Sequence, residues 1–307
     1  MSSLQELRQR QQSVKSTRKI TQAMKMIAAA KLRKAQEKAE SGRPYADSMS
    51  EMISNLLLNL DTFDSSPPTL LTGKVENKTR MLVLVTSNRG LCGGFNGSVV
   101  RRARALARKH EEKGRKFNFL CIGRKGYEQL RFEYGSYIID HYSIPDKPSY
   151  DYACDIGNKI ISLFDSDVFD RCALIYNRFL SAMSQEVCAH RLIPFINMPD
   201  SDIDVLMENI GDVKKFKTES LSSGFYEYEP SEEKVLNSLL PKNISIQVYR
   251  ALLESSAGEQ GARMTAMDSA TRNAGDMIKK LQLEYNRTRQ AHITRELIEI
   301  ISGAEAL

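Results

Sequence analysis

The stretch MTAMDSATRNAGDMIKKLQLEYNRTRQAH, from Met264 to His292, carries the pattern that decides the fold. Its candidate seam positions alternate three and four residues apart: Met264, Met267, Thr271, Ala274, Ile278, Leu281, Tyr285, Thr288 and His292. This spacing is typical of one strand of a two-stranded coiled coil. A second apolar set follows at an offset that reads as a stutter, where supercoiling relaxes: Ile293, Leu297, Ile300 and Ala304.

Both ends of the chain, residues 1–43 and 242–307, are free of proline, the strongest helix breaker. A helix from residue 245 to 303 would be about 85 Å long, so we expect it to protrude from a domain of ordinary width. The N-terminal helix has a narrow apolar stripe, rich in small residues that let a second helix approach closely: Leu4, Leu7, Val14, Ile20, Met24, Ile27, Leu32, Ala35 and Ala39. Residues 45–60 either lie on the central domain or extend the rod beyond a break at Gly42 to Pro44.

Strand-like and helix-like stretches alternate between the two ends. The expected strands are 80–86, 116–122, 136–142, 172–179 and 185–195, and the expected helices are 95–112, 123–135 and 149–166. This order predicts a Rossmann-like α/β domain whose parallel sheet has an antiparallel edge. The predicted organisation is an N-terminal coiled-coil helix (1–60), a linker (61–79), an α/β domain (80–241) with an irregular segment at 197–241, and a C-terminal coiled-coil helix (242–307).

A glycine-rich stretch, TSNRGLCGGFNGS at Thr86 to Ser98, follows the first expected strand. It lacks the Lys-Ser or Lys-Thr of a P-loop, and its glycine spacing differs from the dinucleotide-binding fingerprint. Gly93 and Gly94 precede an expected helix, which leaves an anion site at that helix N-terminus as an open alternative. A tight strand-to-helix turn is the favoured interpretation.

The chain shows no pattern that assigns a catalytic residue, a cofactor or a metal. It has neither a G-x-S-x-G nor an H-E-x-x-H motif, and its histidines are scattered. The five cysteines are odd in number and form no C-x-x-C pair, which predicts free thiols in a reducing compartment. Cys188 and His190 alternate on an expected strand, where packing is a better explanation than metal ligation.

The net charge of +6 comes from the N-terminal segment, since residues 1–43 hold eleven Lys or Arg and three Glu. Such a helix needs an acidic partner surface, a membrane face, nucleic acid or water. Aromatic residues do not interleave with these charges before Tyr45, which disfavours nucleic-acid and membrane-surface binding. A basic coiled-coil adaptor for nucleic acid and a stand-alone nucleotide-binding α/β enzyme remain alternative functions.

Three separated motifs occur in the order typical of one family: KITQAMKMIAAAKLRKAQ (Lys19 to Gln36) followed by RPYADSM, then TSNRGLCGGFN, then ITRELIEIISGAEA (Ile293 to Ala306). Together they resemble the gamma subunit of the F-type, proton-translocating ATP synthase. The resemblance implies a central rotor shaft that is not itself catalytic and binds no cofactor. It implies one copy per complex, with alpha and beta subunits, an epsilon subunit and a membrane c-ring as partners, no nucleic acid, and membrane contact only through those partners.

The resemblance also implies site residues. Those expected to touch the alpha-beta hexamer are Met24, Lys25, Arg263, Arg289, Gln290, Thr294 and Glu296. Tyr228 and Glu229 correspond to a foot region near the c-ring and epsilon subunit. The N-terminus does not look like a transit peptide, so the expected location is the cytoplasmic face of a bacterial inner membrane, as a peripheral subunit.

Overall fold

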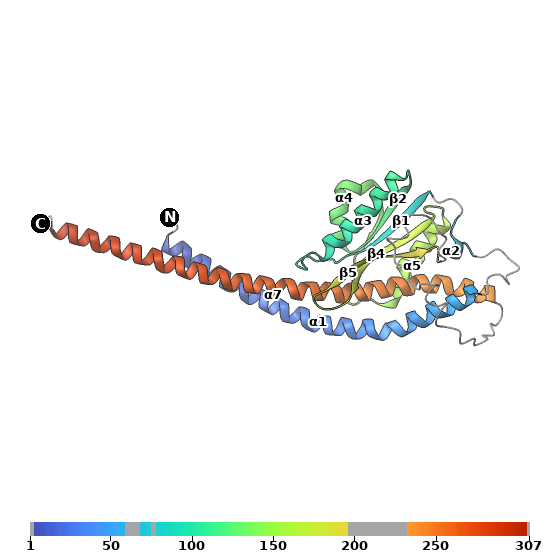
Figure 1. Ribbon diagram of the computed structural model, residues 1–307, viewed down its shortest axis with the longest axis horizontal. Coiled ribbons are helices and arrows are strands. Elements are labelled where there is room, and N and C mark those ends of the chain that lie inside the picture. Colours follow the sequence, from blue (N-terminus) through green and yellow to red (C-terminus); the bar gives the residue numbers. More distant parts are fainter. Residues whose placement is uncertain (1–2, 59–67, 75–77, 196–231, 306–307) are drawn as a thin grey trace. The chain divides into compact units, whose positions relative to one another are not determined.

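The computed structural model describes residues 3–58, 68–74, 78–195 and 232–305. The chain divides into two compact units: one combines Met1–Ala30 with Arg263–Leu307, and the other is Lys31–Ala262. We call them the helical-pair unit and the α/β unit. The main elements, most of which are labelled in Figure 1, are α1 (Leu4–Leu58), α2 (Thr69–Thr72), β1 (Thr79–Val85), α3 (Phe95–Glu112), β2 (Lys116–Ile122), α4 (Arg124–Tyr134), β3 (Ile138–Tyr142), α5 (Tyr150–Asp165), β4 (Arg171–Phe179), β5 (Gln185–Ile193) and α7 (Glu232–Glu305).

The α/β unit contains a five-stranded sheet in the order β3-β2-β1-β4-β5. The first four strands are parallel, while β5 pairs with β4 in the antiparallel direction. The predicted parallel sheet with an antiparallel edge is therefore confirmed. The side chains of β1 alternate between two cores because successive residues face opposite sides of a sheet. Met81 packs with α5 and α7 on one face, and Leu82 packs with α3 and α4 on the other.

Within the α/β unit, α1 passes through Gly42 and Pro44 as one helix, so the expected break is wrong. Proline removes one backbone hydrogen bond and crowds the preceding turn, at a cost of about 3 kcal/mol. Apolar burial offsets this, because Met49 and Ile53 pack against Ile246 of α7. The second half of α1 therefore lies on the α/β unit, which decides between the two alternatives for residues 45–60.

The helix α7 begins at Glu232, before the residue 242 expected from the sequence, and contains Pro241. Leu236 and Leu240 on its first turns pack against Leu71 of α2. This burial holds the turns before the proline in helical form. Residues 196–231 lie outside the described part of the chain, and with them most of the segment expected to be irregular.

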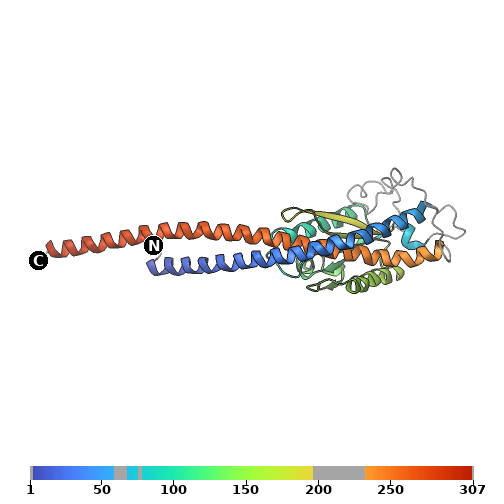
Figure 2. The ribbon, with the colours of Figure 1, turned by 90° about the horizontal axis from the view of Figure 1, so that it is seen from below.

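In the helical-pair unit, α1 and α7 run side by side in opposite directions (Figure 2). Three polar contacts fix their register. Lys25 Nζ lies 2.6 Å from Asp268 Oδ1, Thr271 Oγ1 donates to Thr21 Oγ1 at 2.7 Å, and Gln11 hydrogen-bonds Gln282. From one contact to the next, the residue numbers on α1 fall while those on α7 rise, as an antiparallel coiled coil requires.

The predicted seam of α7 is largely confirmed, because Met267, Ala274 and Leu281 are buried and the remaining positions to Thr288 are half-buried, whereas His292 is exposed. The seam of α1 differs from the expectation at two positions. Ile20 and Ile27 are 60% and 58% exposed, and their neighbours Thr21 and Ala28 are buried instead.

Small side chains at those two seam positions let the helices approach closely. The hydroxyl of Thr21 is satisfied across the seam, so a polar residue is tolerated there. None of the helices in the described ranges has an apolar stretch long enough to span a bilayer.

Candidate partner-binding surface on the terminal helices

The last turns of α7 form the most exposed helical surface in the helical-pair unit. Continuing the antiparallel pairing to Leu4, the first residue of α1, reaches about residue 289 of α7. Figure 2 shows α7 continuing past that end of α1. Between Arg289 and Ala304, every side chain that the structure describes is exposed. We call residues 289–304 the α7 end segment.

Four of the expected hexamer-contact residues lie together on this segment: Arg289, Gln290, Thr294 and Glu296. Thr294 Oγ1 donates to the backbone carbonyl of Gln290 at 2.9 Å, and both side chains are exposed. Glu296 Oε1 lies 3.1 Å from Nδ1 of His292, and both side chains are 59% exposed. An exposed pair of this kind adds little to stability, so these groups can exchange it for contacts with a partner.

Bulky apolar side chains accompany these polar groups on the α7 end segment. Their exposed fractions range from 47% to 67%: Ile293, Leu297, Ile298, Ile300 and Ile301. A water-facing helix seldom carries so many aliphatic residues in so few turns, and contiguous exposed apolar surface marks an interaction site. The offset set noted in the sequence therefore lies at the surface, where it has a different role from the seam.

The other expected contact residues do not join this group. Lys25 lies opposite Asp268, which is roughly 40 Å from Thr294 along α7 at about 1.5 Å per residue. Met24 is half-buried beside it, and Arg263, also half-buried, stands at the start of the α7 part of this unit. The residues expected to contact the hexamer thus form two groups, one on the α7 end segment and one on the coiled coil. Tyr228 and Glu229 lie outside the described residues.

The pairing of Lys25 shows a role that the sequence did not reveal. The hydrogen bond from Lys25, with help from Arg272, lowers the pKa of Asp268 below its ordinary value. Lys25 therefore stabilises the coiled coil, while its side chain remains 43% exposed. The exposed Ile20, Met26 and Ile27 on α1 were also missed as surface residues. Their position off the seam becomes visible only when the register of the two helices is known.

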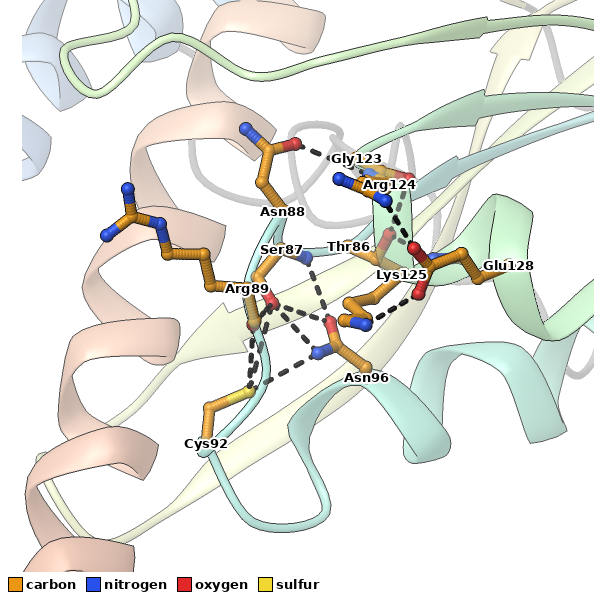
Figure 3. Close-up of polar contacts among 11 residues, drawn as sticks. Thr86, Ser87, Asn88, Arg89, Cys92, Asn96, Gly123, Arg124, Lys125 and Glu128 are labelled. Carbon is orange, nitrogen blue, oxygen red and sulfur yellow. Dashed lines mark hydrogen bonds and ion pairs between the residues drawn. The ribbon is translucent and has the colours of Figure 1, made fainter.

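The glycine-rich loop after β1 is closed by its own side chains (Figure 3). Ser87 N donates to Asn96 Oδ1 at 2.8 Å, and Asn96 Nδ2 donates to Ser87 Oγ at 2.8 Å. Asn88 ties the loop to its neighbours by donating to the carbonyl of Ile144 at 2.6 Å and accepting from the backbone amide of Arg124 at 3.3 Å. The polar groups of this loop thus hold the loop together.

Thr86 and Gly123 show how tightly the loop packs on the next strand. The amide of Gly126 donates to Thr86 Oγ1 at 2.9 Å. A Cβ at Gly123 would lie 2.0 Å from the carbonyl oxygen of Thr86, and the φ of Gly123 is +102°. Both the space and the backbone conformation therefore require glycine there.

In sheets of this topology, ligands bind in the crevice beyond the carboxyl ends of the strands where the strand order reverses. Here that point lies between β1 and β4. Asn177 Nδ2 of β4 donates to the carbonyl of Phe95 at 3.0 Å. On α7, a Cβ at Gly258 would lie 3.2 Å from the Phe95 ring, and one at Gly261 would lie 2.9 Å from the carbonyl of Ala182. The chain itself fills this crevice, which favours a structural role for the loop over nucleotide binding.

All five cysteines lie within the described ranges, and each is a free thiol, as predicted. Cys188 and His190 are both buried on β5, with Cys188 in an apolar core and the ring of His190 5.3 Å from the ring of Tyr176. In the part of the chain that the structure describes, His, Cys, Asp and Glu side chains form no group of three or more suited to a metal ion.

The coiled coil ends in a segment with exposed apolar and polar side chains, and the crevice of the α/β unit is filled by the chain itself. These two features define the class of protein that acts by contacting other subunits of an assembly. A family model described as ATP synthase matches residues 3–307. The chain is 51% identical to the ATP synthase gamma chain of Rhodospirillum rubrum over the full length of both. It belongs to the ATP synthase gamma-chain family, as the resemblance indicated, and is a subunit of that complex.

Solved structures agree with this assignment. A chain in the central stalk and c-ring structure of the Tetrahymena thermophila mitochondrial ATP synthase is 28% identical, with a TM-score of 0.59, and the match covers 82% of this chain and 99% of that one. A chain of the Euglena gracilis mitochondrial enzyme has a TM-score of 0.65 at 18% identity, covering 99% of this chain and 94% of that chain, which supports the fold alone.

Proposed function

We propose that this chain is the central rotor shaft of an F-type ATP synthase. It couples proton flow through a membrane c-ring to ATP synthesis or hydrolysis on a hexamer of alternating alpha and beta subunits. The chain catalyses no bond change itself. The observation that carries the proposal is the α7 end segment, where exposed aliphatic and polar side chains stand together on a helix that continues past its coiled-coil partner.

A shaft acts on identical neighbours only if it presents a different face to each. A ligand with equal affinity for all states of a partner shifts none of them, so the shaft must contact the beta subunits with different free energies. The two helices differ in charge as this requires. Residues 1–43 hold eleven basic and three acidic side chains, whereas residues 251–307 hold seven basic and eight acidic ones.

The hexamer contacts fall into two proposed groups. Arg289, Gln290, Thr294 and Glu296 meet the hexamer at the α7 end segment. Met24, Lys25 and Arg263 form a second group further along the coiled coil, where partly exposed charges make contacts that are weak and easily exchanged as the shaft turns. We further propose that Tyr228 and Glu229 face the c-ring and the epsilon subunit.

One copy of the chain serves each complex in this proposal. It lies at the cytoplasmic face of a bacterial inner membrane and is attached there through the c-ring. The relative from Rhodospirillum rubrum is bacterial, which supports this location. The filled crevice and the family assignment both disfavour the alternatives of a stand-alone nucleotide enzyme and a nucleic-acid adaptor.

The test is ATP hydrolysis by the chain reconstituted with alpha and beta subunits. Arg289→Ala and Gln290→Ala should each lower turnover, and deletion of residues 293–307 should weaken assembly or torque while the α/β unit stays folded by circular dichroism. Arg101→Ala, an exposed arginine on α3, is the matched control and should leave turnover unchanged. Unchanged turnover and coupling in the Arg289 and Gln290 variants would remove both residues from the contact set.

A further inference from the structure

A cavity lies within the α/β unit, where α1, α5 and α7 meet. Its volume is about 350 Å³, at the lower end of the roughly 300–1,000 Å³ typical of small-molecule sites in proteins. Small residues on α1 leave this space open, because Ala39 and Gly42 line it. A Cβ at Gly42 would lie 3.6 Å from Leu253 Cδ1 of α7, so larger side chains there would fill the gap between the helices. We call this cavity the tyrosine pocket.

Three tyrosines, one from each helix, form the aromatic walls of the tyrosine pocket: Tyr45 of α1, Tyr150 of α5 and Tyr249 of α7. Tyr45 and Tyr150 are 60% and 40% exposed, which is a large aromatic surface to leave in water. The rings of Tyr150 and Tyr249 meet edge to face, with their centroids 5.8 Å apart. Another aromatic ring packs well against such edges and faces. The walls therefore favour a flat aromatic ligand.

One ion pair supplies the charged side chains among the described residues of the pocket wall. Arg250 Nε donates to Glu254 Oε1 at 3.1 Å. Glu254 is only 2% exposed, and its second carboxylate oxygen, Oε2, has no hydrogen-bond partner in the described part of the chain. Buried polar atoms are normally satisfied, so this oxygen indicates a donor that the chain alone does not supply.

This ion pair decides the charge of the ligand. The Glu254 carboxylate would repel an anion. A cation would lose its hydration and would lie beside the Arg250 guanidinium, which already balances the carboxylate. A neutral hydroxyl group can donate a hydrogen bond to Oε2 without adding a charge to the pocket.

We propose that the tyrosine pocket binds a small neutral aromatic molecule that carries a hydroxyl group, of the phenol or naphthol class. The aromatic ring lies among the three tyrosines, and the hydroxyl donates to Glu254 Oε2, which turns toward it as the pocket fills. Such a ligand contacts α1 and α7 together and stabilises their packing in the α/β unit. The α7 end segment belongs to the other unit, so the proposal is independent of the rotor function.

The first test is calorimetric titration of the full chain with 2-naphthol, naphthalene and 2-naphthoate. We expect 2-naphthol to bind at one site, roughly tenfold or more tightly than naphthalene, because it alone donates a hydrogen bond to a charged group. The anion 2-naphthoate should bind more weakly than either. The proposal is overturned if 2-naphthol shows no saturable binding, or if naphthalene or 2-naphthoate binds as tightly as 2-naphthol does.

The second test places the ligand in the tyrosine pocket. Gly42→Val fills part of the pocket and should weaken 2-naphthol binding roughly tenfold or more. Gly275→Val, the same change in the α7 part of the helical-pair unit, is the matched control and should leave the affinity unchanged. Valine forms helix better than glycine, so neither change should break its helix. Equal affinities in the two variants would refute the site.

Anomalous diffraction from crystals of the unaltered chain soaked in 6-bromo-2-naphthol decides the location if Gly42→Val does not fold. A bromine peak in the tyrosine pocket is the expected result. Bromine peaks only elsewhere on the chain, or none at all, would refute the site.

Discussion

Replacing Leu297 in the α7 end segment tests whether that residue contacts a partner. Replacing Leu281 in the coiled-coil seam tests a contact within the chain and serves for comparison. The side chain of Leu297 is 54% exposed, whereas Leu281 is 5% exposed. Replacing leucine with alanine removes about three carbon groups, worth about 2.4 kcal/mol when fully buried at about 0.8 kcal/mol each. If a partner covers the exposed part of Leu297, Leu297→Ala loses about 1.3 kcal/mol of binding, a factor of roughly ten in Kd.

The assay is titration of the purified chain into an alpha-beta hexamer that lacks it, together with thermal unfolding of the free chain followed by circular dichroism. Leu297→Ala should raise Kd by this factor and leave the unfolding curve unchanged. Leu281→Ala should lower the stability of the free helical pair by about 2 kcal/mol or more, since it opens a cavity in the seam.

Met183→Ala is the control for exposed apolar surface in general. Met183 is 82% exposed in the connection between β4 and β5. Its replacement should change neither quantity. The reasoning is refuted if Leu297→Ala binds the hexamer as tightly as the unaltered chain, or if it destabilises the free chain as much as Leu281→Ala does.

Three further outcomes follow from the α/β unit and the coiled coil. Gly123→Ala should lower the urea midpoint, because its Cβ would meet the Thr86 carbonyl at 2.0 Å. The hydrogen bond from Lys25 is the main cause of the lowered folded-state pKa of Asp268. The stability that the Asp268 carboxylate contributes is therefore present above its unfolded pKa and is lost as pH falls through its folded pKa. Lys25→Met should reduce this loss of stability at acid pH, measured by equilibrium unfolding. The pKa of His110 is about 4, below the ordinary 6.5, so stability should fall between pH 6.5 and 4 as the unfolded state takes up the proton. His110→Gln should flatten that slope.

The elements of the α/β unit were predicted closely because their signals are local. The range 95–112 coincides with α3, and 116–122 coincides with β2. Each is bounded by turn residues and has an apolar pattern of its own period. The helix through Pro44 was missed because a proline's local penalty is visible in the sequence, but the packing of Ile53 on Ile246 that offsets it is not.

The seam of the coiled coil shows a second limit of sequence patterns. Ile20 and Ile27 are more apolar than Thr21 and Ala28, so the pattern on α1 alone favours the wrong residue at these two seam positions. Which face is buried depends on the register against α7, which Lys25 and Asp268 help to fix from positions far apart in the chain. The exposure of the α7 end segment could not be predicted from the sequence for the same reason. It depends on where α1 ends along α7, and only the structure shows this.

The glycine-rich loop and α7 together explain how an α/β domain of this type fits a shaft. The crevice that holds a ligand in other proteins of similar topology is here closed by Phe95, Asn177 and the Gly258 turn of α7. A bulky side chain at position 258 would push α7 away from the sheet, and so would a ligand in the crevice. The same continuous helix carries the α7 end segment. The α/β unit therefore uses its crevice to hold the helix that, in our proposal, transmits rotation to the hexamer.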